Sequence, residues 1–388
     1  MDKIQLIATA AFGIESIVAN ELKNLGYDDL KVENGKVSFL ADEKAIARCN
    51  LWLRSADRLL LKVGEFEARS FEQLFENTRT LPWGDWIPEK GEFPVEGKSI
   101  TSKLFSVSDC QAIVKKAIVE KLKQKYPCKW FSETGPKYRI EVGLLKDVAT
   151  LTIDTSGPGL HKRGYRRISA PAPLKETLAA AMIIISRWKP DRALIDPFCG
   201  SGTIPIEAAL IGRNIAPGLN RDFAAEKWPV IPARIWLRAR EEARDLIDHN
   251  QPLGILGFDI NNDVINLARH NAGQSGLKDV ISFQCQPVAK LRSKYNYGYI
   301  VCNPPYGERL AEKNEAEILY RQMGEIFKQL DTWSYYVLTS HTHFEKLFNR
   351  PASKRRKLYN GRIQCNLYQF FGPKPITLQG PFAKPPQE

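Results

Sequence analysis

Apolar and polar positions along the first 65 residues alternate between two periods. Apolar residues at positions 4, 6 and 8 follow the two-residue period of a strand, whereas those at 14, 17, 18, 22 and 25 follow helical spacing. The pattern then predicts a strand after an Asn34-Gly35 turn, a helix over 45–53 and a strand over 59–63. This order predicts a small α+β unit over residues 1–65.

Residues 66–160 form a second mixed segment. A helix is predicted around residues 113–122, and strands are predicted over 138–144 and 148–153. The polar face of this helix is basic and includes Lys115 and Lys116. A solvated helix face would have the same composition.

A basic connector, SGPGLHKRGYRR, follows at residues 156–167. A basic cluster around an aromatic ring suits contacts with phosphates and bases, although a charged interdomain linker would look the same. The candidate RNA contacts in this connector are His161, Lys162, Arg163, Tyr165, Arg166 and Arg167.

Strands and helices alternate regularly from residue 174 onward, which predicts an α/β domain with a doubly wound, mostly parallel sheet. The expected strands cover 194–195, 254–258, 280–285, 297–302 and 335–338. The Asn360-Gly361 turn between two alternating segments predicts a carboxyl-terminal antiparallel hairpin. The sequence therefore suggests three domains, over residues 1–65, 66–160 and 161–388.

Composition narrows the class of protein. Lys and Arg number 56 and Asp and Glu 44, so the net charge is +12, which favours a polyanionic partner such as nucleic acid. The apolar stretches are too short to cross a bilayer, so no membrane partner is expected. The seven cysteines are widely spaced and form no CxxC pair, which disfavours a disulfide framework or a metal site and favours a reducing cytosol.

The first candidate motif is ALIDPFCGSGTIPIEAAL, at residues 193–210. A strand ends at Asp196, a tight loop follows, and a helix starts at Thr203. Glycines at 200 and 202 let the backbone approach a ligand closely, and the helix N-terminus offers N–H groups to a carboxylate. The loop lacks the lysine of a nucleotide-triphosphate P-loop.

The second candidate motif is the acid in GFDIN, where a predicted strand ends at Asp259. An acid at this strand end can bind both ribose hydroxyls of a nucleoside-type ligand, although an N-cap aspartate would look the same. It lies 259 − 196 = 63 residues after Asp196, which predicts a long insertion over 213–250 with a charged helix. That insertion disfavours a dinucleotide-binding enzyme, in which the acid follows the glycine loop by about 20 residues.

The most specific motif is YIVCNPPYGERL, at residues 299–310. The Asn303 amide oxygen and the carbonyls of Pro304 and Pro305 offer hydrogen-bond acceptors at the ligand-binding edge of the sheet. Acceptors suit the exocyclic amine of a nucleobase, because they stabilise the positive charge that develops as its nitrogen attacks. Tyr306 can stack on the base.

These residues resemble the motifs of class I S-adenosylmethionine-dependent methyltransferases, which have a Rossmann-like fold. The whole chain is similar to the THUMP-domain RNA methyltransferases, especially the large-subunit ribosomal RNA guanine-N2 family, whose members are often labelled adenine-N6 DNA methylases. KSITSKLFSVSDCQAIVKKAI resembles the core of a THUMP RNA-binding domain, and residues 1–65 resemble the ferredoxin-like unit before it.

The resemblance also implies residue roles. Target-base contacts would be Asn303, Pro304, Pro305 and Tyr306. Cofactor contacts would be Asp196, Cys199, Gly200, Gly202, Thr203, Asp259, Ile260 and Asn303. Gln286 stands where related enzymes often carry an acid, and its amide oxygen can still accept a hydrogen bond from the adenine amine.

The expected activity is therefore methyl transfer from S-adenosyl-L-methionine to an exocyclic base amine, with guanine N2 of 23S ribosomal RNA as the favoured target. RNA or an assembling large ribosomal subunit is the expected partner, and the cytoplasm the expected location. Two alternatives stay open: an adenine-N6 DNA methyltransferase, and a non-catalytic RNA-binding factor for ribosome assembly.

Overall fold

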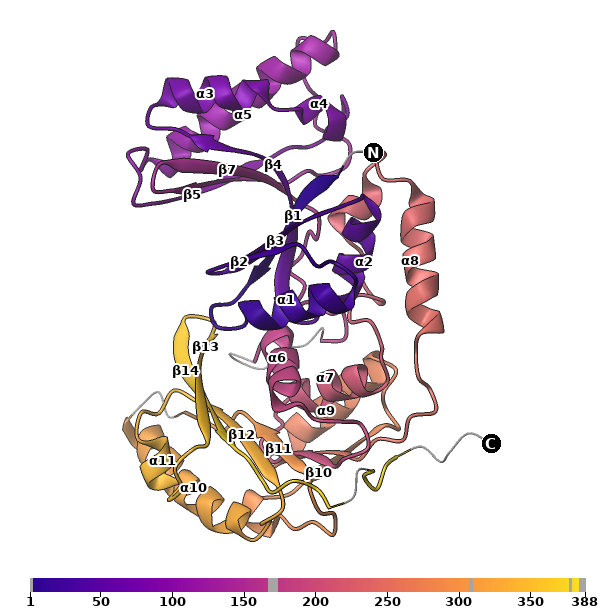
Figure 1. Cartoon of the computed structure of the whole chain (residues 1–388), viewed down its shortest axis with the longest axis vertical. Helices are drawn as coiled ribbons and strands as arrows, with labels where there is room; N and C mark the ends of the chain where they lie inside the picture. Colours follow the sequence, from indigo (N-terminus) through magenta and orange to yellow (C-terminus); the bar gives the residue numbers. More distant parts are fainter. Residues whose placement is uncertain (1–2, 167–173, 307–309, 377–378, 384–388) are drawn as a thin grey trace. The chain divides into compact units, whose positions relative to one another are not determined.

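The computed structural model describes residues 3–166, 174–306, 310–376 and 379–383 (Figure 1). Two compact units divide the chain. The amino-terminal unit comprises residues 1–10, 18–160 and 221–242, and the carboxyl-terminal unit comprises residues 11–17, 161–220 and 243–388.

The first half of the amino-terminal unit has a ferredoxin-like arrangement. Its elements follow the order β1 (Ile4–Ala10), α1 (Glu15–Asn24), β2 (Leu30–Glu33), β3 (Lys36–Ala41), α2 (Lys44–Trp52) and β4 (Ala56–Glu67). The strands are antiparallel in the order β2-β3-β1-β4. Gly26 has a φ of +90° after α1, where a glycine commonly ends a helix.

The same sheet continues into the second half of this unit, because β4 pairs with β1 on one edge and with a strand of the second half on the other. It pairs with β7 (Val148–Asp154), which is followed by β6 (Ile140–Leu145) and β5 (Val95–Ile100). The helices of this half are α3 (Phe71–Thr80), α4 (Trp83–Trp86) and α5 (Val107–Lys125), and Figure 1 shows α3 and α5 over one face of the sheet. Residues predicted as two domains therefore share one seven-stranded sheet.

The long insertion predicted over 213–250 contains η1 (Ala224–Lys227) and the charged helix α8 (Ala233–Asp245). Residues 221–242 pack with the amino-terminal unit, although they lie within the segment that the sequence assigns to the third domain. Trp228 stacks on Tyr138 with ring centroids 4.6 Å apart, and Arg48 pairs with Glu242 at 3.0 Å. Contiguous domain boundaries therefore do not describe how this segment packs.

The carboxyl-terminal unit is a doubly wound sheet with the strand order β10-β9-β8-β11-β12-β14-β13. Its parallel strands are β8 (Leu194–Asp196), β9 (Ile255–Asp259), β10 (Ile281–Cys285), β11 (Tyr299–Cys302) and β12 (Ser334–Thr339). The hairpin of β13 (Lys354–Asn360) and β14 (Ile363–Phe370) adds to β12 in the antiparallel sense. The predicted α/β fold with its terminal hairpin is confirmed.

Helices cover both faces of this sheet. Figure 1 shows α6 (Glu176–Ser186), α7 (Thr203–Gly212) and α9 (Asn262–Gln274) on one side, and α10 (Leu310–Lys328) and α11 (Phe344–Leu347) on the other. Strand order reverses at β8, and ligands of such sheets bind at the carboxyl ends of the strands beside the reversal. No helix among the described residues is long and apolar enough to span a membrane.

Candidate functional site

A cavity of about 520 Å³ opens at the carboxyl ends of β9 and β11. The residues that line it come from six segments of the chain: Pro197, Phe198, Asp259, Ile260, Pro287, Val288, Ala289, Asn303, Pro304, Pro305, Tyr306, Leu319, Gln322, Asn360 and Ile363. The second and third sequence motifs therefore meet in one cavity, because parallel strands end at the same edge of the sheet. A volume of this size is typical of small-molecule sites.

The loop after β8 is tied to the end of β9 by hydrogen bonds. The backbone N–H of Gly200 donates to Asp259 Oδ2 at 3.1 Å, and that of Cys199 donates to the carbonyl of Phe258 at 2.8 Å. Asp259 Oδ1 accepts from the N–H of Asn261 at 3.0 Å. These bonds fix the Asp259 carboxylate in the cavity wall and leave each oxygen a further lone pair for a ligand hydroxyl.

The two glycines of this loop have different surroundings. Gly202 has a φ of +86°, and a Cβ there would lie 3.1 Å from both the Cβ of Ala268 and the ring of Phe283. Gly200 has a φ of +52°, but a Cβ there would meet no heavy atom within 4 Å. The loop is therefore packed against the protein at Gly202 and open at Gly200.

The predicted cofactor residues divide into those that line the cavity and those behind it. Asp259, Ile260 and Asn303 line it, and Ile260 is 74% exposed. The positions behind the lining are Asp196, Cys199, Gly200, Gly202 and Thr203. From the same loop, Pro197 and Phe198 reach the cavity instead.

Two of the predicted cofactor residues behind the lining are buried ionisable groups. Burial raises the pKa of the Asp196 carboxyl well above its usual range, and the nearby Asp259 carboxylate adds to the shift. Burial likewise raises the pKa of the Cys199 thiol. Asp196 Oδ1 accepts a hydrogen bond from the Phe198 N–H at 3.1 Å, so this acid shapes the turn of the loop.

The predicted contact of Gln286 with the cofactor adenine stays a prediction. Gln286 is not among the cavity-lining residues, whereas the next three residues, Pro287, Val288 and Ala289, are. Its backbone N–H donates to the carbonyl of Asp259 at 2.9 Å, which ties the end of β10 to that of β9. The three apolar residues after Gln286 therefore form this part of the cavity wall.

The acceptors of the NPPY motif are already partly engaged within the protein. The Tyr306 hydroxyl donates to Asn303 Oδ1. The Tyr320 hydroxyl donates to the Pro305 carbonyl at 2.7 Å and lies 3.0 Å from Thr339 Oγ1. Among the described residues no donor is assigned to the Pro304 carbonyl, whereas Asn303 Oδ1 would have to exchange the Tyr306 hydroxyl for a ligand and the Pro305 carbonyl serves the loop itself.

Residues 307–309 of the NPPYGERL motif lie outside the described residues. Sequence reasoning also missed part of the cavity wall. Leu319 and Gln322 come from α10, and Asn360 and Ile363 flank the turn of the β13–β14 hairpin. The turn itself was predicted, but its position at the cavity depends on strand order, which the local pattern does not contain.

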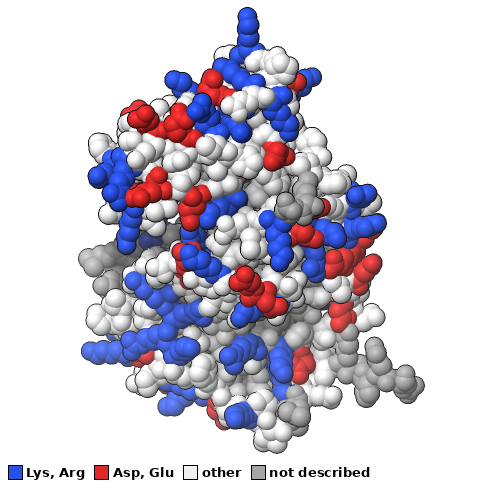
Figure 2. Space-filling view, turned by 45° about the horizontal axis from the view of Figure 1, so that its top comes forward, with Lys and Arg blue, Asp and Glu red and all other residues white. Residues whose placement is uncertain are grey.

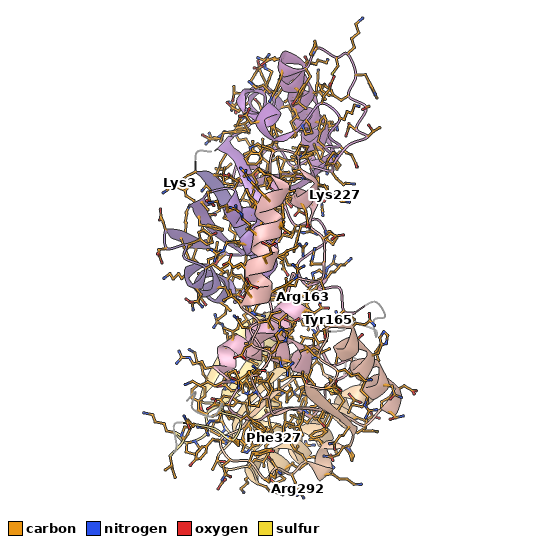
Figure 3. All side chains as sticks on the ribbon, turned by 90° about the vertical axis from the view of Figure 1, so that its right-hand side faces the viewer. Lys3, Arg163, Tyr165, Lys227, Arg292 and Phe327 are labelled. Atoms are coloured by element: carbon orange, nitrogen blue, oxygen red, sulfur yellow. The ribbon has the colours of Figure 1, made fainter. Side chains whose placement is uncertain are left out.

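The structure corrects the interpretation of the basic connector as an RNA-binding surface. Arg163 is 4% exposed, and its Nε and Nη2 atoms lie 3.3 Å from the two carboxylate oxygens of the fully buried Glu207. Tyr165 is buried beside it and donates to Glu207 Oε1 at 3.2 Å (Figure 3). RNA cannot reach either side chain, so the prediction is wrong for both.

Arg166 is also engaged inside the protein. It pairs with Glu176 at 2.9 Å and lies 3.2 Å from the hydroxyl of Thr203, the first residue of α7. Arg167 lies outside the described residues. The connector thus anchors α7, which begins directly after the glycine loop, and its composition reflects that structural role.

The other predicted RNA contacts differ in their surroundings. Lys115 pairs with Glu133 at 2.6 Å and donates to the carbonyl of Phe93 at 2.9 Å, so it stabilises the amino-terminal unit. Lys116 and Lys162 are exposed and His161 is half-buried, and their contacts with RNA stay predictions. Within the described part of the chain, no three His, Cys, Asp or Glu side chains are grouped to hold a metal ion.

Family models match three consecutive parts of the chain. Residues 5–60 match an RlmL ferredoxin-like domain, residues 68–154 a THUMP domain, and residues 163–369 an RMKL-like methyltransferase domain. The chain is 52% identical to a Bacillus subtilis (strain 168) protein named "Putative RNA methyltransferase YpsC", over 96% of this chain and 97% of that protein. It is 34% identical to the ribosomal RNA large subunit methyltransferase K/L of Syntrophotalea carbinolica over 95% of this chain. The chain spans about half of that K/L relative, because the match covers 53% of the relative's length.

Solved structures of other proteins are similar in fold to this chain over nearly its whole length. A Listeria monocytogenes protein described as a "predicted N6-adenine-specific DNA methylase" is 53% identical, with a TM-score of 0.93 over 96% of this chain and 97% of that one. SMU.472, described as a "putative methyltransferase complexed with SAH", is 47% identical, with a TM-score of 0.92 over 96% of this chain and 99% of that one.

The buried pair of Arg166 and Glu176 predicts a pH-dependent stability. Burial raises the pKa of Glu176 from 4.5 to about 7, and the Arg166 charge only partly opposes this shift. A carboxyl whose pKa is higher in the folded state stabilises the fold fully below pH 4.5 and loses that contribution as the pH rises to about 7. The free energy of unfolding of the native protein, relative to Glu176→Gln, should therefore fall by up to about 3 kcal/mol over this range.

Urea unfolding of the native protein and the Glu176→Gln variant at several pH values between 4.5 and 8 measures this difference. Glu315→Gln removes an exposed acid from α10 and is the matched control. Parallel stability curves for the native protein and Glu176→Gln across this range would contradict the prediction.

Proposed function

The chain belongs to the family of RMKL-like methyltransferases that carry an RlmL ferredoxin-like domain and a THUMP domain, and from this premise we propose that it methylates guanine N2 of large-subunit (23S) ribosomal RNA. Methyltransferases of this class use S-adenosylmethionine, and a solved relative is described as a complex with SAH. The supporting observation is that Asp259, the acid proposed to bind the ribose, and the NPPY motif, proposed to bind the amine, line one cavity.

The residues present fit the cofactor. The Asp259 carboxylate offers acceptors for the two ribose hydroxyls, and Ile260 with Pro287 and Val288 gives the adenine apolar walls. The backbone at Gly200 faces open space, so a ligand can approach it closely. When bound, S-adenosylmethionine supplies a sulfonium methyl group, which the base nitrogen accepts as the carbon–sulfur bond breaks.

The chain's own contribution is to hold the target amine and to stabilise its charge. Asn303 Oδ1 and the Pro304 carbonyl accept the two N–H bonds of the amine, so that positive charge on the attacking nitrogen is stabilised before a proton leaves to solvent. Tyr306 offers its ring to the flipped base, once its hydroxyl releases Asn303. Binding of the base therefore exchanges an internal hydrogen bond for one to the substrate.

Support for RNA as the substrate class comes from the THUMP domain and from the K/L relative, which is named for ribosomal RNA. The seven cysteines are free thiols, so we place the protein in the reducing cytoplasm, where ribosomal RNA is made. The description of the Listeria relative favours adenine N6 of DNA as the second candidate activity.

Transfer of labelled methyl groups decides between these activities. The purified protein is incubated with labelled S-adenosylmethionine and either large-subunit ribosomal RNA or duplex DNA, and the products are digested to nucleosides. N2-methylguanosine from RNA supports the proposal, whereas N6-methyladenine from DNA overturns it in favour of the alternative. Calorimetry that finds no binding of S-adenosylmethionine would instead favour a non-catalytic RNA-binding factor.

Asn303→Ala should lower kcat for methyl transfer by about 100-fold to 1,000-fold, because one of the two acceptors that stabilise the developing charge is lost. RNA affinity should stay within about threefold of the native value, since the other acceptors and the basic surfaces are intact. Single-turnover transfer and separate binding titrations measure these effects. A kcat within tenfold of native would remove Asn303 from its proposed role.

The two loop glycines give a matched pair of variants. Gly202→Ala should lower the free energy of unfolding by about 1–3 kcal/mol, because its Cβ would press on Ala268 and Phe283 at positive φ. Gly200→Ala meets no such contact, so its stability loss should be smaller, while its methyl group enters the space proposed for the cofactor.

Thermal unfolding and calorimetry with S-adenosylmethionine separate the two variants. Gly200→Ala is expected to weaken cofactor binding by about tenfold or more, given roughly 1.4 kcal/mol for each factor of ten. Native cofactor affinity in Gly200→Ala would show that the cofactor does not approach this loop.

A further inference from the structure

The β13–β14 hairpin carries a one-sided charge. Residues 354–370 contain five basic residues and no acidic residue: Lys354, Arg355, Arg356, Lys357 and Arg362. Figure 2 shows Lys and Arg side chains gathered at the lower left of the face in view, with few acidic side chains between them. Such a concentration of one sign of charge attracts polyanions.

Three of these basic side chains are not committed to the fold. Arg355 pairs with Glu345, and Arg356 donates to the Gly13 carbonyl at 2.8 Å. Lys354, Lys357 and Arg362 are exposed, and no ion pair joins them to an acid among the residues that the structure describes. The predicted RNA contacts Lys115, Arg163 and Arg166 are by contrast paired with carboxylates.

The tip of the hairpin borders the cavity of the NPPY motif. Asn360 and Ile363 face each other across the turn, and both line the cavity. Side chains alternate between the faces of a strand, so Tyr359 and Lys357 lie on the opposite face of the hairpin from Asn360. A strand of RNA whose base enters the cavity would therefore continue over the tip and past Arg362.

A pair of aromatic rings, of which Phe12 is exposed and Tyr359 half-buried, lies beside these charges. The ring of Phe12, which is 47% exposed, meets that of Tyr359 edge to face, with centroids 5.9 Å apart. Lys357 Nζ lies 5.6 Å from the centroid of the Tyr359 ring. Phe12 belongs to the same compact unit as the hairpin. Basic side chains beside exposed rings form the surface that binds single-stranded nucleic acid.

A simpler explanation for the charges is protection of an edge strand. β13 lies at the edge of its sheet, and lysines there discourage pairing with other chains. That explanation accounts for neither the aromatic pair with its exposed Phe12 ring nor the position of the tip at the cavity. It also predicts no effect of these charges on RNA binding, so the two explanations can be separated.

We propose that the β13–β14 hairpin is an RNA-binding element, in which Lys357 and Arg362 contact phosphates beside the target nucleotide and the Phe12–Tyr359 pair stacks on a neighbouring base. This inference rests on the proposed function, because it takes RNA as the substrate of the cavity. The carboxyl-terminal unit would therefore bind the RNA nucleotides next to the target base.

The charge contribution is tested with the double variant Lys357→Gln/Arg362→Gln in the full chain. Its control is Lys278→Gln/Lys294→Gln, which removes two exposed lysines that precede β10 and β11 and so lie at the opposite edge of the parallel sheet. The probes are a large-subunit ribosomal RNA transcript and a 12-nucleotide single-stranded RNA, titrated by fluorescence anisotropy at several salt concentrations.

We expect the hairpin variant to lose about tenfold in RNA affinity at 0.1 M salt. Its plot of log affinity against log salt should be shallower by about 1.4, which corresponds to about 0.7 for each phosphate contact with a single strand. In methyl transfer, KM for RNA should rise while kcat stays within twofold. The control pair should leave the salt slope within about 0.3 of native.

The stacking contribution is tested with Phe12→Ala, which removes an exposed ring. RNA affinity should fall by about tenfold with an unchanged salt slope, because stacking releases no counterions. An affinity within twofold of native would remove the aromatic pair from the proposed element.

The outcomes distinguish this inference from the proposed function. Methylation of RNA by the native protein, together with an unchanged salt slope in Lys357→Gln/Arg362→Gln, overturns the hairpin proposal alone. A reduced slope without methylation of RNA by the native protein supports the hairpin and overturns the proposed function. An unchanged slope with increased aggregation of the variant would assign these charges to edge protection, against the proposal.

Discussion

The hydrogen bond from the Gly200 backbone to Asp259 Oδ2, 3.1 Å long, is the constraint on which the site depends. It joins the loop after β8 to the end of β9, and so sets the distance between the two motifs that border the cavity. The second oxygen of Asp259 is held by the Asn261 N–H, so the carboxylate is oriented before any ligand arrives. An oriented acceptor costs less entropy to bind than a mobile one.

Much of this arrangement could be predicted because it depends on local sequence. Asp259 and Asn303 each follow a short apolar strand, and parallel strands bring such positions to one edge of a sheet. The residues that sequence reasoning missed depend on long-range order. Asn360 lines the cavity only because the hairpin adds next to β12, and Tyr320 reaches the Pro305 carbonyl only because α10 packs under the loop.

The errors in the predicted RNA surface have a common physical cause. A cluster of arginines with a tyrosine has the composition of a nucleic-acid contact, but composition does not say whether an acid lies opposite. Here Glu207, in the otherwise apolar sequence of α7, pairs with Arg163 and accepts from Tyr165. A single carboxylate within an apolar helix was the signal that a buried basic partner exists, because an unpaired buried charge is strongly unfavourable. The hairpin itself carries no acid, and its Lys354, Lys357 and Arg362 are exposed and form no ion pair with a described acid.

The engaged acceptors of the NPPY motif explain how the site can be stable before the target base enters. Asn303 is half-buried, and the Tyr306 hydroxyl gives its amide oxygen a partner by donating to it. In the proposed reaction, an N–H of the target base replaces the Tyr306 hydroxyl as the donor to Asn303 Oδ1. The proposed exchange would leave this oxygen with a hydrogen-bond partner both before and after the base enters, so the loop need not rearrange its acceptors to receive the substrate.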